Sequence, residues 1–304
     1  MIATRPGSVE LVEVCPRDGL QNYPVTLPTA AKVALIRRLA AAGLRRIEVA
    51  SFVNPRRVPQ MADAEAVVAA LHDLDGVSLS ALVLNERGFD RALGGMLHEI
   101  SFAVVASETF SQRNQGASIA ETLAAWRRLA PRVAAAGLRR SVTIAAAFGC
   151  PFEGEVPLSR VAELADAIAG IGTDELALAD TIGVGVPAAV EERFGALTQR
   201  LPGMKLRGHF HNTRNTGLAN ADAALRAGVT MLDASLGGLG GCPFAPGASG
   251  NIATEDLAYM LDRSHVGHDG RFAALRDAAL WLEGELGGRL PAQSAHVAIF
   301  PAAV

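Results

Sequence analysis

The chain has 304 residues, of which half are hydrophobic and 19% are charged, and its formal net charge is −3 at pH 7. This near-neutral balance, without a basic segment, excludes the charge pattern of a nucleic-acid-binding protein, and the lack of an apolar run of about 18 residues excludes a membrane-spanning helix. The N-terminus has no apolar signal segment and the three cysteines are too few for a disulfide framework, so we expect a cytoplasmic protein with reduced thiols.

Strand and helix patterns alternate along the chain. The strand patterns are short and rich in β-branched residues, whereas the helix patterns have apolar residues at helical spacing. In chain order, we expect strands over Ser8–Val14, Arg46–Ala50, Val77–Val83, Glu99–Val105, Ser141–Ala147, Asp174–Ala179, Lys205–Phe210 and Val229–Ala234. The expected helices cover Pro28–Ala42, Ala62–Leu74, Glu86–Leu93, Ile119–Ala136, Leu158–Ala169, Pro187–Arg200, Gly217–Arg226 and Thr254–Asp262.

Eight such strand–helix units predict an α/β protein with the (β/α)8 TIM barrel fold. An open doubly wound sheet is the alternative, but no glycine-rich dinucleotide motif follows the first strand. We therefore assign residues 1–264 to a barrel domain. Residues 265–304 form a C-terminal helical extension, with a helix over Phe272–Leu286, packed on the barrel or on a partner subunit.

Polar residues gather where the predicted strands end, which is where the functional groups of a TIM barrel lie. They are Arg17, Asp18 and Gln21 after the first strand, Glu48 and Ser51 at the second, Asp180 and Thr181 at the sixth, His209 and His211 at the seventh, and Asp233 at the eighth. We expect these side chains to face one end of the barrel.

The spacing of His209 and His211 places both rings on one face of a strand. Two imidazoles at the mouth of a barrel indicate a metal site more than two unrelated structural histidines. Asp18 could add an oxygen ligand from the first strand. Mixed nitrogen and oxygen ligands favour Mg²⁺ or Mn²⁺ over a structural zinc ion.

Glu48 lies within an apolar strand, so it needs a partner or its pKa rises, and Arg17 is the candidate partner. Arg17 and Asp18 could instead form a surface ion pair. Adjacent loop residues seldom pair with each other, however, which favours a role for both in the site. Asp180 is a candidate of the same kind as Glu48, and Asp233 could equally be a hydrogen-bonding residue of the lumen.

The segment Gly237–Asn251 after the eighth strand contains six glycines and no charged residue. Such a loop could close over a substrate and exclude water, which would bring Cys242 to the site. The alternative is that Cys242 packs as a small apolar side chain, the role that we expect for Cys15 and Cys150.

These segments together resemble the 3-hydroxy-3-methylglutaryl-CoA lyases, which belong to a group of metal-dependent barrel lyases and synthases. The resemblance extends from about residue 8 to residue 262, and its most specific part is the glycine-rich segment around Cys242. The matching segments are Val14–Asn22, Ile47–Phe52, Val58–Met61, Asp180–Val184, His209–His211 and Gly237–Asp256.

The resemblance implies a set of site residues. The implied metal ligands, for Mg²⁺ or Mn²⁺, are Asp18, His209, His211 and Asn251. It further implies that Arg17 polarises a substrate carbonyl, that Glu48 supports Arg17 and that Cys242 is a catalytic thiol. Asp18 and a histidine both remain open as the general base.

The implied reaction is retro-Claisen cleavage of 3-hydroxy-3-methylglutaryl-CoA into acetyl-CoA and acetoacetate. We expect a CoA thioester as the substrate and a homodimer as the assembly. The candidate substrate contacts are Gln21, Ser51, Asp180 and Thr181.

Several alternatives remain open. One is a lyase for citramalyl-CoA or for a long-branched 3-hydroxyglutaryl-CoA, because the sequence departs from the family pattern at Tyr23 and Asn212. Others are a Claisen-type synthase on the same barrel and a CoA- or metal-binding protein without turnover. Arg56, Arg57 and Arg113 could meet CoA phosphates, but we take them as solvated.

Overall fold

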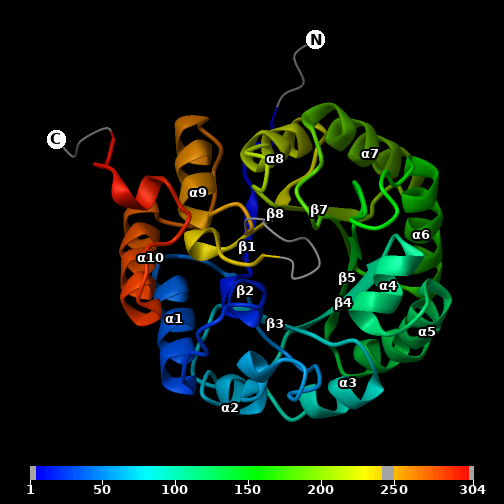
Figure 1. Ribbon diagram of the computed structural model, residues 1–304, viewed down its shortest axis with the longest axis horizontal. Coiled ribbons are helices and arrows are strands. Elements are labelled where there is room, and N and C mark those ends of the chain that lie inside the picture. Colours follow the sequence, from blue (N-terminus) through cyan, green and yellow to red (C-terminus); the bar gives the residue numbers. More distant parts are fainter. Residues whose placement is uncertain (1–4, 242–249, 301–304) are drawn as a thin grey trace.

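The computed structural model describes residues 5–241 and 250–300 and has the predicted (β/α)8 TIM barrel. Within these residues, parallel strands pair in chain order and the last strand closes the ring on the first (Figure 1). The strands are β1 (Glu10–Glu13), β2 (Arg46–Ser51), β3 (Ser78–Leu82), β4 (Glu99–Val105), β5 (Arg139–Ala145), β6 (Glu175–Asp180), β7 (Lys205–Phe210) and β8 (Met231–Ala234).

Helices surround the ring of strands (Figure 1). They are α1 (Thr29–Ala41), α2 (Ala64–Ala69), α3 (Glu86–Ala92), α4 (Glu108–Gln115), α5 (Ile119–Ala135), α6 (Leu158–Ile171), α7 (Pro187–Arg200), α8 (Gly217–Arg226), α9 (Thr254–Arg263) and α10 (Phe272–Leu286). Short helical turns are η1 (Cys15–Gly19), η2 (Pro59–Met61), η3 (Leu236–Gly238) and η4 (Ser294–His296). Helix α10 packs on α1 and α9, so the C-terminal extension contacts the barrel of its own chain.

Helix α5 illustrates how the sequence builds the outer layer. The Ser118 hydroxyl accepts a hydrogen bond from the Glu121 backbone N–H, and the Glu121 carboxylate accepts one from the Ser118 backbone N–H, which forms a capping box. Trp126 and Leu129, three positions apart, are fully buried on the inner face. The Trp126 ring stacks on Phe102 of β4 with the centroids 5.0 Å apart. The apolar core therefore lies between the helices and the outside of the barrel.

Several element ends differ from the prediction by one to five residues, the most at α2, which ends at Ala69 instead of Leu74. Three further differences have an identifiable cause. Residues 15–19 form a π-helical turn where we expected a loop, and helix α4 was not predicted because its sequence is almost entirely polar. Ser107 caps α4 by accepting a hydrogen bond from the Phe110 N–H. Strand β5 begins two residues earlier than predicted, because Arg139 pairs with Glu99 of β4 instead of facing solvent.

Ion pairs fill the lower end of the barrel lumen. Arg46, at the start of β2, is 0% exposed and binds Glu99 at 2.7 Å and Glu175 at 2.8 Å. These carboxylates begin β4 and β6, so the guanidinium crosses the N-terminal end of the barrel to reach both. Arg207 of β7 lies 3.0 Å from Glu175 and 3.1 Å from Asp233 of β8. We call these five residues the ionic floor.

Two buried carboxylates tie the segments above the barrel together. Glu13 accepts hydrogen bonds from the backbone N–H groups of Cys15 and Leu236 at 2.8 and 3.0 Å, and from the Thr254 hydroxyl at 2.7 Å. Glu255 accepts the Gly237 N–H on both oxygens at 3.1 Å. Burial raises the pKa of Glu13 to about 7 and the pKa of Glu255 to about 8. These bonds hold turn η1 and the start of the glycine-rich segment against α9.

Glu255→Gln should remove part of the pH dependence of stability. Glu255 has a pKa of about 8 in the folded protein and near 4.3 when unfolded, so the unfolded state binds fewer protons between these values. The free energy of unfolding of the wild type therefore falls as the pH rises from about 5 to about 8. Because Gln cannot ionise, the variant should gain stability relative to the wild type over this range in urea unfolding. Glu285→Gln, at an exposed position on α10, is the control, and equal pH slopes for all three proteins would contradict the assignment.

Candidate active site

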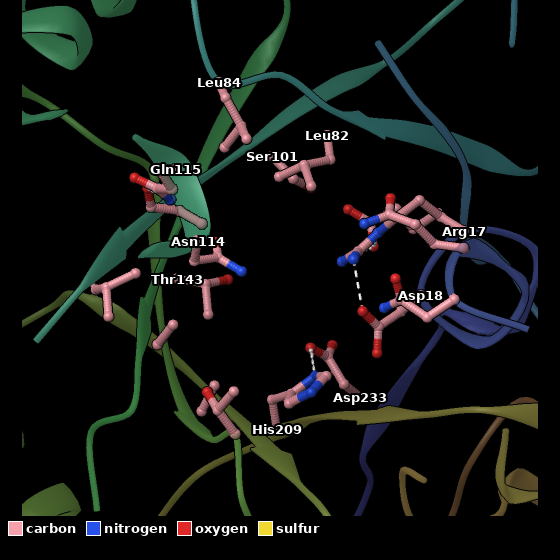
Figure 2. Close-up of a pocket in the computed structure, with 18 of the residues that line it drawn as sticks. Arg17, Asp18, Leu82, Leu84, Ser101, Asn114, Gln115, Thr143, His209 and Asp233 are labelled. Atoms are coloured by element: carbon pink, nitrogen blue, oxygen red, sulfur yellow. Dashed lines mark hydrogen bonds and ion pairs between the residues drawn. The ribbon is translucent and has the colours of Figure 1, made fainter. Parts of the chain in front are cut away.

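A cavity of about 180 Å³ opens at the carboxyl ends of the strands, directly above the ionic floor (Figure 2). Charged groups line one side, with Arg17, Asp18 and Asp233 projecting toward the hollow in Figure 2. Asn114 and Thr143 face them across it. The cavity therefore combines a charged wall with a wall that carries uncharged polar groups among apolar side chains such as Leu84 and Phe110.

Small side chains create this space. Ser101 and Ala103 on β4, Thr143 and Ala145 on β5, and Ala179 on β6 all line the cavity. Each pair is two positions apart, so its members share the inner face of the strand. Below them on the same face lie the large ion-paired residues of the floor. The lumen is consequently filled at its lower end and open at its upper end.

Asp18, His209 and His211 converge on one point of the cavity wall. One ligand atom from each lies within 4.8 Å of the other two, and the Nε2 atoms of the two histidines are 3.2 Å apart. Asp18 lies in turn η1, His209 in β7 and His211 directly after that strand. Both histidines are buried.

Asn251 completes this cluster. Its Nδ2 donates hydrogen bonds to Asp18 Oδ2 at 2.8 Å and to the Leu239 carbonyl at 2.9 Å. Its Oδ1 is buried and has no hydrogen-bond partner among the described residues, and the same holds for His211 Nδ1. A free amide oxygen beside a carboxylate and two imidazoles fits a divalent cation.

The electrostatics keep Asp18 and His211 in forms that can bind a cation. Burial by itself would raise the pKa of Asp18, but the charges of Arg17 and of the two histidines outweigh it and lower the pKa to about 2. Burial, together with the charge of His209, lowers the pKa of His211 to about 3. At neutral pH, Asp18 is therefore an anion and His211 is neutral.

Arg17 is held between two carboxylates. Its guanidinium lies 2.5 Å from Glu48 and 2.6 Å from Asp18, and its Nε donates to Glu48 Oε2 at 2.6 Å. The expectation that the adjacent residues Arg17 and Asp18 would not pair was wrong. The π-helical turn Cys15–Gly19 directs both side chains into the cavity, where they meet away from bulk solvent. Burial raises the pKa of Glu48, and Arg17 opposes that shift.

Of the four expected substrate contacts, two line the cavity and two lie outside its lining. Gln21 and Thr181 line it. Ser51 lies behind Gln21 and donates a hydrogen bond to Gln21 Oε1 at 2.8 Å. Asp180 accepts the backbone N–H groups of Val184 and Gly185, both at 2.9 Å, so its contacts organise the turn after β6.

Tyr23 and Asn212, where the sequence departs from the family pattern, do not line the cavity. Tyr23 packs on the apolar core, and its carbonyl accepts a hydrogen bond from Gln60. The Asn212 side chain accepts the N–H of Gly217 at the start of α8. Both residues have local structural partners.

Cys242 lies outside the described residues. Its neighbour Gly241 lines the cavity. At Gly240 the backbone has a φ of +105°, and a Cβ there would lie 2.5 Å from Asn251 Nδ2. Glycine therefore lets this backbone approach Asn251 closely. Cys15 and Cys150 are buried, and burial raises the pKa of the Cys15 thiol well above its ordinary value.

The ionic floor and a second cavity were not predicted from the sequence. Charged residues inside otherwise apolar strands, such as Arg46 and Arg207, were the available signal for the floor. The second cavity, of about 620 Å³, shares Asn114 and other residues with the first. Arg57 and Arg113 line it, and both are exposed, as expected for solvated side chains.

The chain is similar to known proteins over most of its length. Residues 8–281 match the family model described as HMGL-like. The hydroxymethylglutaryl-CoA lyase YngG of Bacillus subtilis is 41% identical over 96% of this chain and 98% of its own, and the (R)-citramalyl-CoA lyase of Chloroflexus aurantiacus is 44% identical over 94% and 93%. The structure of an HMG-CoA lyase from Acinetobacter baumannii in complex with coenzyme A and 3-methylmalate is 35% identical, with a TM-score of 0.93 over 98% of this chain and 97% of that chain.

His211→Ala should weaken binding of Mn²⁺ by at least about 100-fold, because loss of a direct ligand should exceed the 10- to 100-fold typical of outer-shell changes. The dissociation constant can be measured from the electron paramagnetic resonance signal of free Mn²⁺. His72→Ala removes an exposed histidine on the barrel exterior and should bind as the wild type does. A folded His211→Ala protein with wild-type affinity would exclude this cluster as the cation site.

Proposed function

The chain belongs to the HMGL-like family, and we propose that it cleaves 3-hydroxy-3-methylglutaryl-CoA into acetyl-CoA and acetoacetate. Membership in this family makes it a carbon–carbon lyase that acts on CoA thioesters. One observation carries the proposal for this chain. The cluster of Asp18, His209 and His211 faces the same small cavity as the Arg17–Glu48 ion pair. A retro-Claisen cleavage needs a group that activates the substrate hydroxyl, which the cluster would provide through a bound cation. It also needs a positive charge that stabilises the enolate, which the guanidinium of Arg17 would provide.

For the first feature, we assign the ligands of a divalent cation, Mg²⁺ or Mn²⁺, to Asp18, His209, His211 and Asn251. Two carboxylate or amide oxygens and two imidazoles suit these cations. When bound, such an ion polarises substrate oxygens and lowers the pKa of a coordinated hydroxyl. The pKa of about 2 makes Asp18 a weak proton acceptor, so we assign it to cation binding rather than to general-base catalysis.

For the second feature, we assign the enolate-stabilising charge to Arg17. A general base, for which a histidine of the cluster remains the candidate, takes the proton of the C3 hydroxyl. The bond between C2 and C3 then breaks, its electron pair moves onto the thioester, and negative charge develops on the thioester oxygen. Glu48 and Asp18 already hold the guanidinium at the cavity wall, at 2.5 and 2.6 Å. A charge fixed before the reaction stabilises the transition state without reorganising.

The enolate carbon must then receive a proton, and we assign that step to the thiol of Cys242. The residue before it in the chain, Gly241, is part of the cavity lining. The other two cysteines are buried, and Cys150 accepts hydrogen bonds from the backbone N–H groups of Phe152 and Glu153.

The second cavity offers a place for the CoA arm. It joins the first through Gln21, Asn22 and Asn114, and it carries the positive charges of Arg57 and Arg113. A chain of polar groups that ends in two guanidinium groups suits a pantetheine arm followed by phosphates. The relative from Acinetobacter baumannii was solved with coenzyme A bound.

Citramalyl-CoA is the second candidate substrate, favoured by the 44% identity to the lyase from Chloroflexus aurantiacus. The two thioesters differ by one methylene between C3 and the free carboxylate.

We further propose a cytoplasmic homodimer with a barrel domain over residues 1–264. Among the described residues, no helix is long and apolar enough to span a membrane.

A panel of acyl-CoA esters tests the function. With Mn²⁺ present, we expect acetyl-CoA release from 3-hydroxy-3-methylglutaryl-CoA with the highest kcat/KM. Citramalyl-CoA should be slower by about 10- to 200-fold, the discrimination that one methylene allows. A long-branched 3-hydroxyglutaryl-CoA should be poor, because the cavity holds only about 180 Å³. If none of the three esters releases acetyl-CoA, the lyase assignment for this chain is wrong.

Arg17→Lys should lower kcat by about 10²- to 10³-fold while KM changes little, because the charge on the enolate oxygen develops only on the way to the transition state. Lysine keeps the charge but lacks the planar fork that reaches Glu48 and Asp18 together. Steady-state assays of acetyl-CoA release measure this, with the exposed Arg127→Lys as the matched control. A nearly normal kcat in the Arg17→Lys enzyme would remove Arg17 from the reaction.

A further inference from the structure

A line of buried ion pairs connects His209 with the ionic floor. Asp233 Oδ2 lies 2.9 Å from His209 Nδ1, which Figure 2 marks with a dashed line. The other oxygen of Asp233 lies 3.1 Å from Arg207, and Arg207 lies 3.0 Å from Glu175. All four side chains are buried. The carboxylate of Asp233 is therefore shared between a guanidinium and an imidazole.

We propose that Asp233 is a positioning residue that fixes the tautomer of His209, so that the proton stays on Nδ1 and the Nε2 lone pair faces the cation site. A carboxylate paired with a guanidinium only accepts hydrogen bonds, so Nδ1 of His209 must be the donor. A neutral imidazole with its proton on Nδ1 has its acceptor at Nε2. That Nε2 atom is the one 3.2 Å from His211 Nε2. The inference rests on the cation site proposed above.

Arg207 determines how the amide group of Asp233→Asn would be oriented. A guanidinium has donors only, so the Asp233 atom beside it must be an oxygen. In Asp233→Asn, the amide oxygen would therefore face Arg207 and the NH₂ group would face His209. That NH₂ group donates to Nδ1 and drives the ring proton to Nε2, which blocks the lone pair needed for the cation. Asp233→Ala imposes neither tautomer.

The two variants of Asp233 should therefore lose cation affinity in an order that a purely structural role for Asp233 would not produce. Asn has nearly the size of Asp and should preserve packing better than Ala, yet it should harm cation binding more. The matched control is Glu99→Gln, which also removes one buried negative charge from the ionic floor. The ion pairs of Glu99 are with Arg46 and Arg139, not with Arg207 or His209.

The experiment measures the dissociation constant of Mn²⁺ alone for the full-length protein and the three variants. We expect Asp233→Asn to weaken binding by about 100-fold and Asp233→Ala by about tenfold, within the range of outer-shell effects. Glu99→Gln should stay within a few-fold of the wild type. Binding by Asp233→Asn that equals or exceeds that of Asp233→Ala would overturn the inference, and so would an equal loss in Glu99→Gln.

A second measurement needs no substitution of Asp233. Nitrogen-15 NMR of histidine-labelled, metal-free wild type in mildly alkaline buffer reports which ring nitrogen of His209 carries the proton, with the resonance assigned from His209→Ala. A proton on Nδ1 supports the inference, and a proton on Nε2 overturns it even if the variants do not fold. If the wild type binds no Mn²⁺ while the Nδ1 tautomer is found, the proposed cation site fails and the tautomer assignment stands.

Discussion

Arg46 crosses the centre of the barrel with no exposed surface, and Glu99 and Glu175 hold it from two other strands. A buried pair of this kind gains little over a well-packed apolar layer, because desolvation offsets most of the attraction. Net stability therefore does not explain why the lower end of this barrel is ionic. The floor instead provides fixed charges beneath the cavity, where Arg207 and Asp233 continue the series of ion pairs up to His209.

Buried hydrogen bonds explain how loops can hold the side chains of the site in fixed positions. Arg17 and Asp18 lie in a π-helical turn, and Asn251 follows the glycine-rich segment, so neither group is on a strand. Glu13 accepts backbone N–H groups at the start of both segments, and the Asp18–Asn251 hydrogen bond links the two segments a second time. Backbone hydrogen bonds to a buried carboxylate thus replace the rigidity that a strand would give.

The alternation of strand and helix patterns was sufficient to predict the barrel, and the ends of β7, α7, α8 and α10 agree with the prediction to the residue. Local pattern could not predict α4, whose polar sequence depends on the Ser107 cap, or the start of β5, where Arg139 is paired rather than solvated. The histidine pair was visible because its spacing is local. The partner of Arg46 on β6 is 129 residues away, and only closure of the barrel brings the two together. Cys242 lies outside the described residues, and its role remains a prediction.

The hydrogen bond between Asp18 and Asn251 spans 233 positions of the chain. During synthesis, Asp18 leaves the ribosome early, whereas Asn251 emerges only after every strand of the barrel has been made. The proposed ligand set is therefore incomplete on any nascent chain that stops before the segment after β8. A chain that ends between residues 211 and 251 retains the two histidines and the aspartate, but it lacks the amide that binds the aspartate. In the proposed site, the full ligand set is therefore present only once the chain has grown past residue 251, after the last strand of the barrel.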